Sequence, residues 1–234
     1  MGTRHLICIF YKGRFVVAQY GQWDGYPDGQ GATIFKFLVK PENIARLKEG
    51  LQFVYIPTNE ELKEINEKVK KLDSEESEKG IPTSGSKSAL NQIYPSLSRD
   101  AGGDILEIIA QGSEEKRIPT QLYMEFANDG LFCEWAYVVD LDDEVFEVYG
   151  GAEEKSKSAS KRFHDVGDEN ETVPAFLKSF AFKELPATEK EFLDAFSNGE
   201  DEAEGEEDDG GEAKEEVDVE ASKVGNVRSA ATTG

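Results

Sequence analysis

Residues 5–20 read HLICIFYKGRFVVAQY, and this stretch decides the fold class. It contains two runs rich in β-branched and aromatic residues, 5–11 and 15–20, joined by the short connection Lys12-Gly-Arg14. A glycine in a short connection between two such runs is typical of a β-hairpin. Both runs are apolar on both faces, so we expect two strands that are covered on both sides.

A second hairpin is expected over 132–149, with its turn at Asp142-Asp143. Between the hairpins the apolar residues repeat with helical spacing, while the segment 73–88 has the composition of a loop. The strongest helix start is the capping box Thr58-Asn-Glu-Glu61. Further helical stripes lie at 34–38, 44–51, 105–109 and 192–196. The order predicts an α+β fold, in which two β-hairpins form an antiparallel sheet with several helices packed on it.

The composition of the chain changes at about residue 199. Residues 200–234 contain no aromatic residue, four valines, and 13 Asp or Glu against three Lys or Arg. Such a segment cannot bury enough apolar surface to offset the entropy lost on ordering. We therefore predict a single α+β domain over 1–198 and a disordered acidic tail over 199–234. The tail is expected to be a solvated spacer or an electrostatic segment for a basic protein partner.

The formal net charge of the chain is −22, and the tail carries only part of this charge, so the domain before the tail is also acidic. An acidic body repels a phosphate backbone, so no nucleic-acid partner is expected. The basic, serine-rich stretch 155–162 is interpreted as a solvated loop. We see no signal-peptide pattern and no apolar run of about 20 residues, so we expect no membrane partner and a cytoplasmic protein, with the nucleus as the alternative. Cys8 and Cys133 lie in apolar runs and are expected to be reduced core residues.

The segment Gly21-Gln-Trp-Asp-Gly-Tyr-Pro-Asp-Gly-Gln-Gly31 sets this sequence apart. Its glycines let the backbone turn sharply, and its aromatic residues offer flat apolar surface beside hydrogen-bonding groups. We expect a small polar ligand to bind here. The candidate binding residues are Gln19, Gln22, Trp23, Asp24 and Tyr26, with Arg4, Arg99 and Asp100 in second rank. The alternative is a structural loop, in which Trp23 packs on the core and Asp24 caps a turn.

Catalysis is the rival hypothesis, and the sequence leaves open whether the protein is an enzyme. A metal-independent hydrolase or transferase would use Asp24 as its acid or base, with Asp100 as the partner carboxylate. Asp100 or Asp104 could equally be the N-cap of the following helix. His5 and His164 are the only histidines, and no metal-ligand spacing is present, so neither a metal nor a cofactor is predicted.

Several segments together resemble a protein family common in fungi, with shorter bacterial and phage relatives. They are Gly2-Thr-Arg-His-Leu6, Gln19-Tyr-Gly-Gln-Trp-Asp-Gly-Tyr-Pro27, Gly29-Gln-Gly31, Ser98-Arg-Asp100, Glu134-Trp-Ala-Tyr-Val138 and Asp140-Leu-Asp142. The resemblance spans residues 2–196. This family has no assigned activity, so the resemblance implies a shared site at the glycine-rich loop and no particular chemistry.

A weaker resemblance is to the N-terminal-nucleophile hydrolases, which begin with a short leader, an apolar strand, a tight turn and a second strand. Those enzymes attack with a Cys, Ser or Thr at the new N-terminus. Here removal of Met1 exposes Gly2, and Thr3 becomes terminal only if Gly2 is removed as well. The resemblance therefore implies a related fold without the nucleophile.

Overall fold

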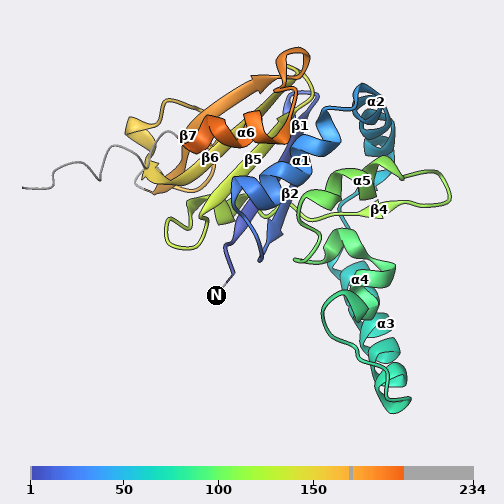
Figure 1. Cartoon of the computed structure of the whole chain (residues 1–234). Coiled ribbons are helices and arrows are strands. Elements are labelled where there is room, and N and C mark those ends of the chain that lie inside the picture. Colours follow the sequence, from blue (N-terminus) through green and yellow to red (C-terminus); the bar gives the residue numbers. More distant parts are fainter. Residues whose placement is uncertain (1, 169–170, 198–234) are drawn as a thin grey trace, which may run out of the picture. The chain divides into compact units, whose positions relative to one another are not determined.

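The computed structural model describes residues 2–168 and 171–197, and its central element is a five-stranded sheet in the order β2-β1-β5-β6-β7 (Figure 1). The strands are β1 (His5–Tyr11), β2 (Arg14–Gly21), β5 (Trp135–Asp140), β6 (Val145–Glu154) and β7 (Thr172–Ala181). Both predicted hairpins are present, as the antiparallel pairs β1–β2 and β5–β6. With the helices described below, this confirms the α+β fold class. The predicted tail over 199–234 lies outside the described residues.

The two hairpins join through a parallel pair, which the sequence analysis did not predict. Strand β1 runs parallel to β5, with His5 opposite Trp135 and Phe10 opposite Asp140. The sheet is therefore mixed rather than antiparallel throughout. Parallel neighbours need a long crossover connection, and the helical segment between β2 and β5 supplies it. A separate pair of short parallel strands, β3 (Val54–Tyr55) and β4 (Ile118–Pro119), lies within this crossover.

Helices fill the crossover and follow the last strand (Figure 1). They are α1 (Ala32–Leu38), α2 (Pro41–Gly50), α3 (Asn59–Glu78), α4 (Ala89–Ile93), α5 (Ile105–Ala110) and α6 (Glu189–Ser197). Single turns of other helical types are η1 (Pro27–Gly31), η2 (Leu51–Phe53), η3 (Gly85–Lys87), η4 (Pro95–Leu97), η5 (Gly102–Asp104), η6 (Met124–Asn128), η7 (Lys155–Lys157) and η8 (Phe182–Glu184). No helix among the described residues is both long enough and apolar enough to span a membrane.

Helix α3 begins where the sequence predicts and ends later than it predicts. Its capping box forms as expected: the Thr58 hydroxyl accepts from Glu61 N at 3.2 Å, and the Glu61 carboxylate accepts from Thr58 N at 2.8 Å. The helix continues through residues 73–78, however, which the composition had assigned to a loop. Glutamate and lysine are good helix formers, so the helix ends only just before Gly80, whose φ of 73° is left-handed.

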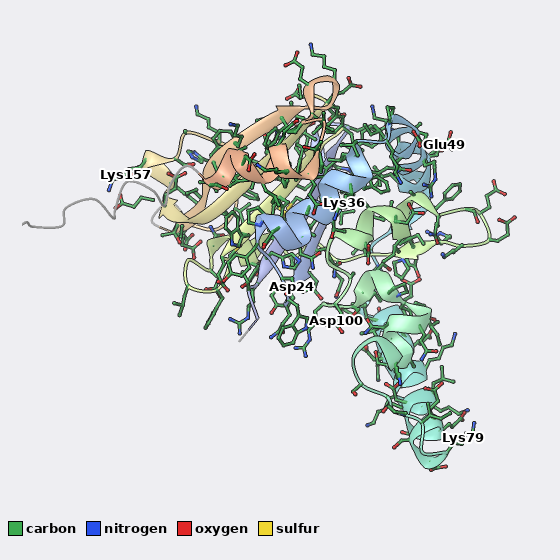
Figure 2. The ribbon with its side chains drawn as sticks, in the orientation of Figure 1. Asp24, Lys36, Glu49, Lys79, Asp100 and Lys157 are labelled. Atoms are coloured by element: carbon green, nitrogen blue, oxygen red, sulfur yellow. The ribbon has the colours of Figure 1, made fainter. Side chains whose placement is uncertain are left out.

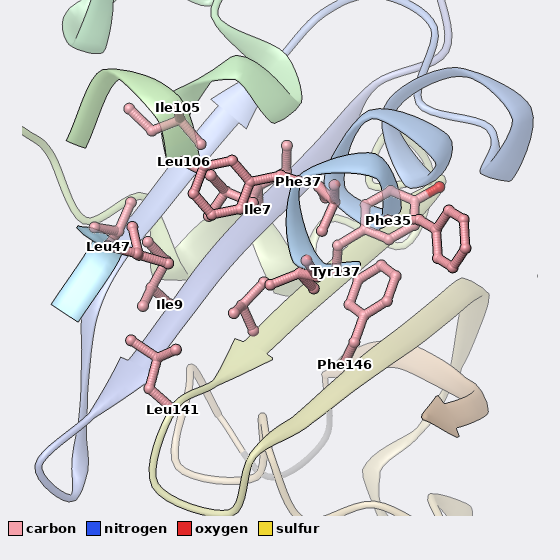
Figure 3. Close-up of a cluster of buried hydrophobic side chains, with 14 of the residues drawn as sticks. Ile7, Ile9, Phe35, Phe37, Leu47, Ile105, Leu106, Tyr137, Leu141 and Phe146 are labelled. Carbon is pink, nitrogen blue, oxygen red and sulfur yellow. The ribbon is translucent and has the colours of Figure 1, made fainter. Parts of the chain in front are cut away.

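The helices cover one face of the sheet. Alternate residues of β1, β5 and β6 point into this side, where α1, α2, α5 and α6 contribute the opposing apolar side chains (Figure 3). The buried members include Ile7, Ile9, Tyr137, Val139, Phe146, Val148, Phe35, Phe37, Leu47, Ile105, Leu106 and Phe192. This cluster is the larger part of the hydrophobic core, and it places the helices that follow the glycine-rich loop.

The opposite face of the sheet is covered by segments without long helices. The other set of alternating residues, such as Leu6, Cys8 and Val138, packs there against Ala127 and Phe163. Cys133 belongs to the same cluster, so both cysteines are buried and unpaired core residues, as predicted. Burial raises the pKa of the Cys133 thiol to about 12, which keeps the thiol protonated at neutral pH.

Candidate functional site

The glycine-rich loop is held by the segment before β1 and by strand β5. Gly25 N donates to the Thr3 carbonyl at 3.1 Å, and the Tyr137 hydroxyl donates to the Gly25 carbonyl at 2.7 Å. Asp24 adopts a left-handed φ of 55°, which turns the chain outward at this point. Its carbonyl accepts from Gln30 N at 2.9 Å and closes the loop on itself. The loop is therefore fixed by its backbone.

The loop lies against residues 99–100, so the structure brings together four of the predicted site residues. Gln22 N donates to the Arg99 carbonyl at 3.2 Å, and Arg99 Nη1 donates to Gln22 Oε1 at 2.9 Å. The Trp23 indole Nε1 donates to Asp100 Oδ1 at 3.1 Å. Asn91 Nδ2 donates to the other oxygen, Asp100 Oδ2, at 3.0 Å. Two segments that are 77 positions apart thus share one hydrogen-bonded surface.

A cleft of about 430 Å³ opens beside this contact, and we name it the Trp23 cleft. It is lined by Trp23, Gly85, Asn91, Pro95, Asp100, Ala101, Asp104 and Ile108. Figure 2 labels Asp24 on the loop and Asp100 on the opposing segment. Trp23 is 46% exposed, so its ring presents apolar surface to an incoming molecule. The lining of the cleft contains two carboxylates and an amide but no Lys or Arg, which favours hydrogen-bond donors on the ligand.

The other predicted residues lie elsewhere. Gln19 is 1% exposed, and its amide donates to the Ser98 carbonyl at 2.9 Å, so it holds strand β2 to the segment before Arg99 instead of lining a surface. Arg4 lies over the Phe132 ring, 4.3 Å from its centroid. Tyr26 is exposed and contacts Trp135, with ring centroids 6.3 Å apart. Of the eight candidate residues, only Trp23 and Asp100 line the Trp23 cleft, and whether the other six bind a ligand stays a prediction.

Three local expectations also need correction. Trp23 does not pack in the core, since almost half of its surface is exposed. The Asp24 side chain makes no hydrogen bond to the described residues, so the turn is formed by its backbone and not capped by its carboxylate. Asp104 stands at the N-cap of α5 but its side chain makes no capping bond, while the Asp100 carboxylate is engaged by Trp23 and Asn91.

Next to the loop lies a buried histidine, His5, which was not among the predicted site residues. His5 is 1% exposed, and neither ring nitrogen finds a hydrogen-bond partner of good geometry among the described residues. Burial lowers the pKa of His5 to about 4, with the nearby Thr3 carbonyl opposing this shift. A Cβ at Gly21 would lie 2.0 Å from His5 Nε2, so any larger residue at this end of β2 would force the buried His5 ring to move.

A second polar cluster, on the face of the sheet opposite the helices, was missed entirely. Arg162 is bidentate to Glu147, with Nε–Oε2 and Nη2–Oε1 distances of 2.9 Å. Its Nη2 also lies 2.7 Å from Oδ2 of Asp140, a carboxylate that is 0% exposed. The Tyr149 hydroxyl donates to Glu147 Oε2 at 2.9 Å. Burial lowers the pKa of the Arg162 guanidinium, but the two carboxylates together outweigh burial and raise it above its usual range, so the guanidinium stays charged.

The interpretation of residues 155–162 as a solvated loop is therefore wrong at both ends. Lys155 is 6% exposed, and its ammonium donates to the carbonyls of Val166 and Asp168. The Arg162 side chain is 15% exposed. A signal was present in the sequence: the apolar runs WAYVVD and VFEVY each contain one carboxylate, at Asp140 and Glu147, and a buried carboxylate requires a cation nearby.

No family model matches the chain, and neither a curated protein nor a solved structure matches it. The resemblance to the fungal family thus stays a prediction, and the function is argued from the site alone. Among residues 2–168 and 171–197, no group of three or more His, Cys, Asp or Glu side chains is placed to hold a metal ion.

Proposed function

We propose that the domain is a binding module for a small polar ligand, held in the Trp23 cleft. The observation that carries this proposal is the half-exposed Trp23 ring, whose indole edge is fixed by Asp100 at the cleft of about 430 Å³. Fixing an aromatic ring before the ligand arrives removes part of the entropy cost of binding. Aromatic surface with a few placed polar groups is the usual composition of a ligand site.

The lining of the cleft selects the polar end of the ligand. Asp100 and Asp104 are acceptors when ionised, and no cation lines the cleft to neutralise them. A hydroxyl, amide N–H or ammonium group satisfies these carboxylates, and a ring or ammonium group also gains from the face of Trp23. We infer that the ligand carries several hydrogen-bond donors and a small apolar part, as polyols, amides and amines do.

The catalytic alternative receives less support from the same geometry. It requires Asp24 and Asp100 to act as a pair of carboxylates, yet Asp24 is not among the residues that line the cleft. Both oxygens of Asp100 accept N–H groups, from Trp23 and Asn91, and these bonds hold it as an acceptor. Asp24→Asn tests the alternative: a turnover that this variant abolishes, without loss of stability, would establish catalysis instead of simple binding.

The binding proposal is tested by Trp23 fluorescence. Trp23 and Trp135 are the only tryptophans, so Trp135→Phe leaves Trp23 as the single reporter. A panel of polyols, primary amides and alkylamines is titrated into this variant. The affinity of each compound that changes the Trp23 fluorescence is then measured on the unmodified protein by calorimetry. We expect at least tenfold weaker binding in Trp23→Ala and in Asp100→Asn.

Tyr26→Ala is the matched control, because Tyr26 is 51% exposed on the same loop and does not line the cleft. It should bind the ligand as tightly as the unmodified chain. Equal losses in Tyr26→Ala and Trp23→Ala would show that the loop as a whole, and not the Trp23 cleft, binds the ligand. If no compound in the panel perturbs Trp23, the proposal fails for these three ligand classes.

A further inference from the structure

We propose a second ligand site, independent of the Trp23 cleft, for an uncharged aromatic molecule that carries a carbonyl acceptor. It lies in a cleft of about 850 Å³ on the sheet face opposite the helices, which we name the Arg162 cleft. The hairpin turn of β1–β2, the turn η6 and the segment 160–167 surround it. Neither its position nor any of its lining residues was predicted as a site from the sequence.

The apolar part of the lining is aromatic and preorganised. Phe10 and Phe15 lie in edge-to-face contact, with ring centroids 5.3 Å apart, and Phe15 stacks on Phe163 at 5.9 Å. Met124 and Val166 complete the apolar part of the lining. Rings that already hold each other lose little freedom when a flat ligand packs on them. This part of the cleft selects a ring.

The polar part of the lining supplies a fixed hydrogen-bond donor. The Arg162 guanidinium lies 4.9 Å from the Phe10 centroid, and its Nε and Nη2 atoms are held by Glu147 and Asp140. Its third nitrogen, Nη1, donates to no group among the described residues and is not one of their buried unpaired atoms. The Nη1 hydrogens are therefore open to the cleft, where they match a carbonyl oxygen.

The charges around the cleft exclude a strongly charged ligand. Three cations line it, at Arg14, Lys161 and Arg162, and three carboxylates line it, at Glu125, Glu147 and Asp165. Asp140, buried behind Arg162, adds one more negative charge. An anion therefore meets a guanidinium that two carboxylates already neutralise, and a cation meets three positive side chains beside the four carboxylates, so neither gains a strong net attraction. The balance favours a neutral ligand with one acceptor.

The chain offers a direct reporter for this cleft, because Met124 is one of only two methionines and the other is Met1. Protein labelled with ¹³C at the methionine methyl groups gives one signal for each, and Met124→Leu assigns them. Benzamide, benzoate and benzylamine share a ring and differ in charge, so they serve as probes. We expect benzamide to shift the Met124 signal with at least fivefold higher affinity than either charged probe.

Variants connect the signal to the proposed contacts. Arg162→Lys retains the positive charge and removes the guanidinium fork, and it should weaken benzamide binding at least fivefold. Phe15→Leu keeps the lining apolar and removes one ring, and it should weaken all three probes equally, so it also serves if Arg162→Lys does not fold. Trp23→Ala should leave the Met124 shifts unchanged, which separates this site from the Trp23 cleft.

Three results would overturn the proposal. The first is a Met124 signal that no probe moves up to the solubility limit. The second is benzoate or benzylamine binding as tightly as benzamide, which would refute the inferred ligand class. The third is undiminished benzamide binding in Phe15→Leu, which would place the probe outside the cleft. None of these results bears on the Trp23 cleft, so failure here and failure of the proposed function are distinguishable.

Discussion

The Trp23 cleft and the Arg162 cleft are built from different kinds of residues. The first is formed by the glycine-rich loop and by short helices and turns of the crossover, and its key side chains, Trp23 and Asp100, are exposed and hydrogen-bonded to each other. The second is formed by a face of the sheet, and its guanidinium rests on Asp140, which is completely buried. We therefore expect that substitutions in the Trp23 cleft have little effect on folding, whereas the Arg162 cleft shares its polar groups with the core.

The largest expected effect is the loss of the Arg162 cation. Arg162→Leu leaves Asp140 and Glu147 without their partner in a buried position, which costs about 3–5 kcal/mol of unfolding free energy. Arg99→Leu is the matched control at the other cleft, because Arg99 is exposed and bonds only to Gln22 there. It should cost less than about 0.5 kcal/mol. Urea denaturation of both variants measures the difference, and equal values would erase the contrast between the clefts.

The second largest effect concerns His5, the buried residue next to the glycine-rich loop, and the change of its stability contribution with pH. The folded-state pKa of His5, about 4, lies below its unfolded value of 6.5, so protonation favours the unfolded chain. The contribution of neutral His5 to the unfolding free energy is fully present above pH 6.5 and is lost as the pH falls toward 4. Between pH 7 and pH 5 the loss is about 2 kcal/mol.

His5→Leu isolates this contribution, because the other titrating groups remain in both proteins. The unfolding free energy of the unmodified chain should fall by about 2 kcal/mol more than that of His5→Leu between pH 7 and pH 5. Urea denaturation at the two pH values measures it. Parallel pH profiles would mean that the ring of His5 is solvated in the folded protein and does not support the loop.

The smallest effect on stability is expected at the Trp23 cleft itself. Trp23→Ala removes an exposed ring and one hydrogen bond at the surface, so its unfolding free energy should lie within about 1 kcal/mol of the unmodified chain. Thermal unfolding beside Tyr26→Ala measures it. A loss of more than about 3 kcal/mol would show that Trp23 holds the loop together. The binding proposal would then be tested with Asp100→Asn alone, because weaker binding in Trp23→Ala could result from partial unfolding.

Local sequence patterns predicted both hairpins and most helices, because these depend on neighbouring residues, whereas β7, the fifth strand of the sheet, was not predicted. The run of β-branched and aromatic residues in 5–11 and the capping box at Thr58 each specify a local structure that the fold retains. The parallel joint between β1 and β5 depends on how the crossover returns to the sheet, and no short pattern encodes it. The residues 73–78 were misassigned because serine and glutamate are common in both loops and exposed helices.

The same distinction applies to the two clefts. The glycine-rich loop is continuous in sequence, so its density of glycine and aromatic residues indicated a candidate site, although Trp23 alone of the loop residues lines the cleft. The Arg162 cleft brings together residues from several strands and loops that are far apart in the sequence. Phe10 and Asp140 are 130 positions apart and meet only because their strands pair in register. Such a site can be identified only when the order and register of the strands are known.

The parallel pairing of β1 with β5 has a consequence for synthesis of the chain. The partner of His5 is Trp135, which leaves the ribosome 130 residues later. At about 5–20 residues per second, this delay is roughly 7–25 s. During this time β1 and β2 have emerged, but the inner edge of β1 offers unpaired backbone groups beside Leu6 and Cys8. Newly made N-terminal segments are therefore the most exposed to association with one another, and a chaperone that binds apolar strands would act on them first.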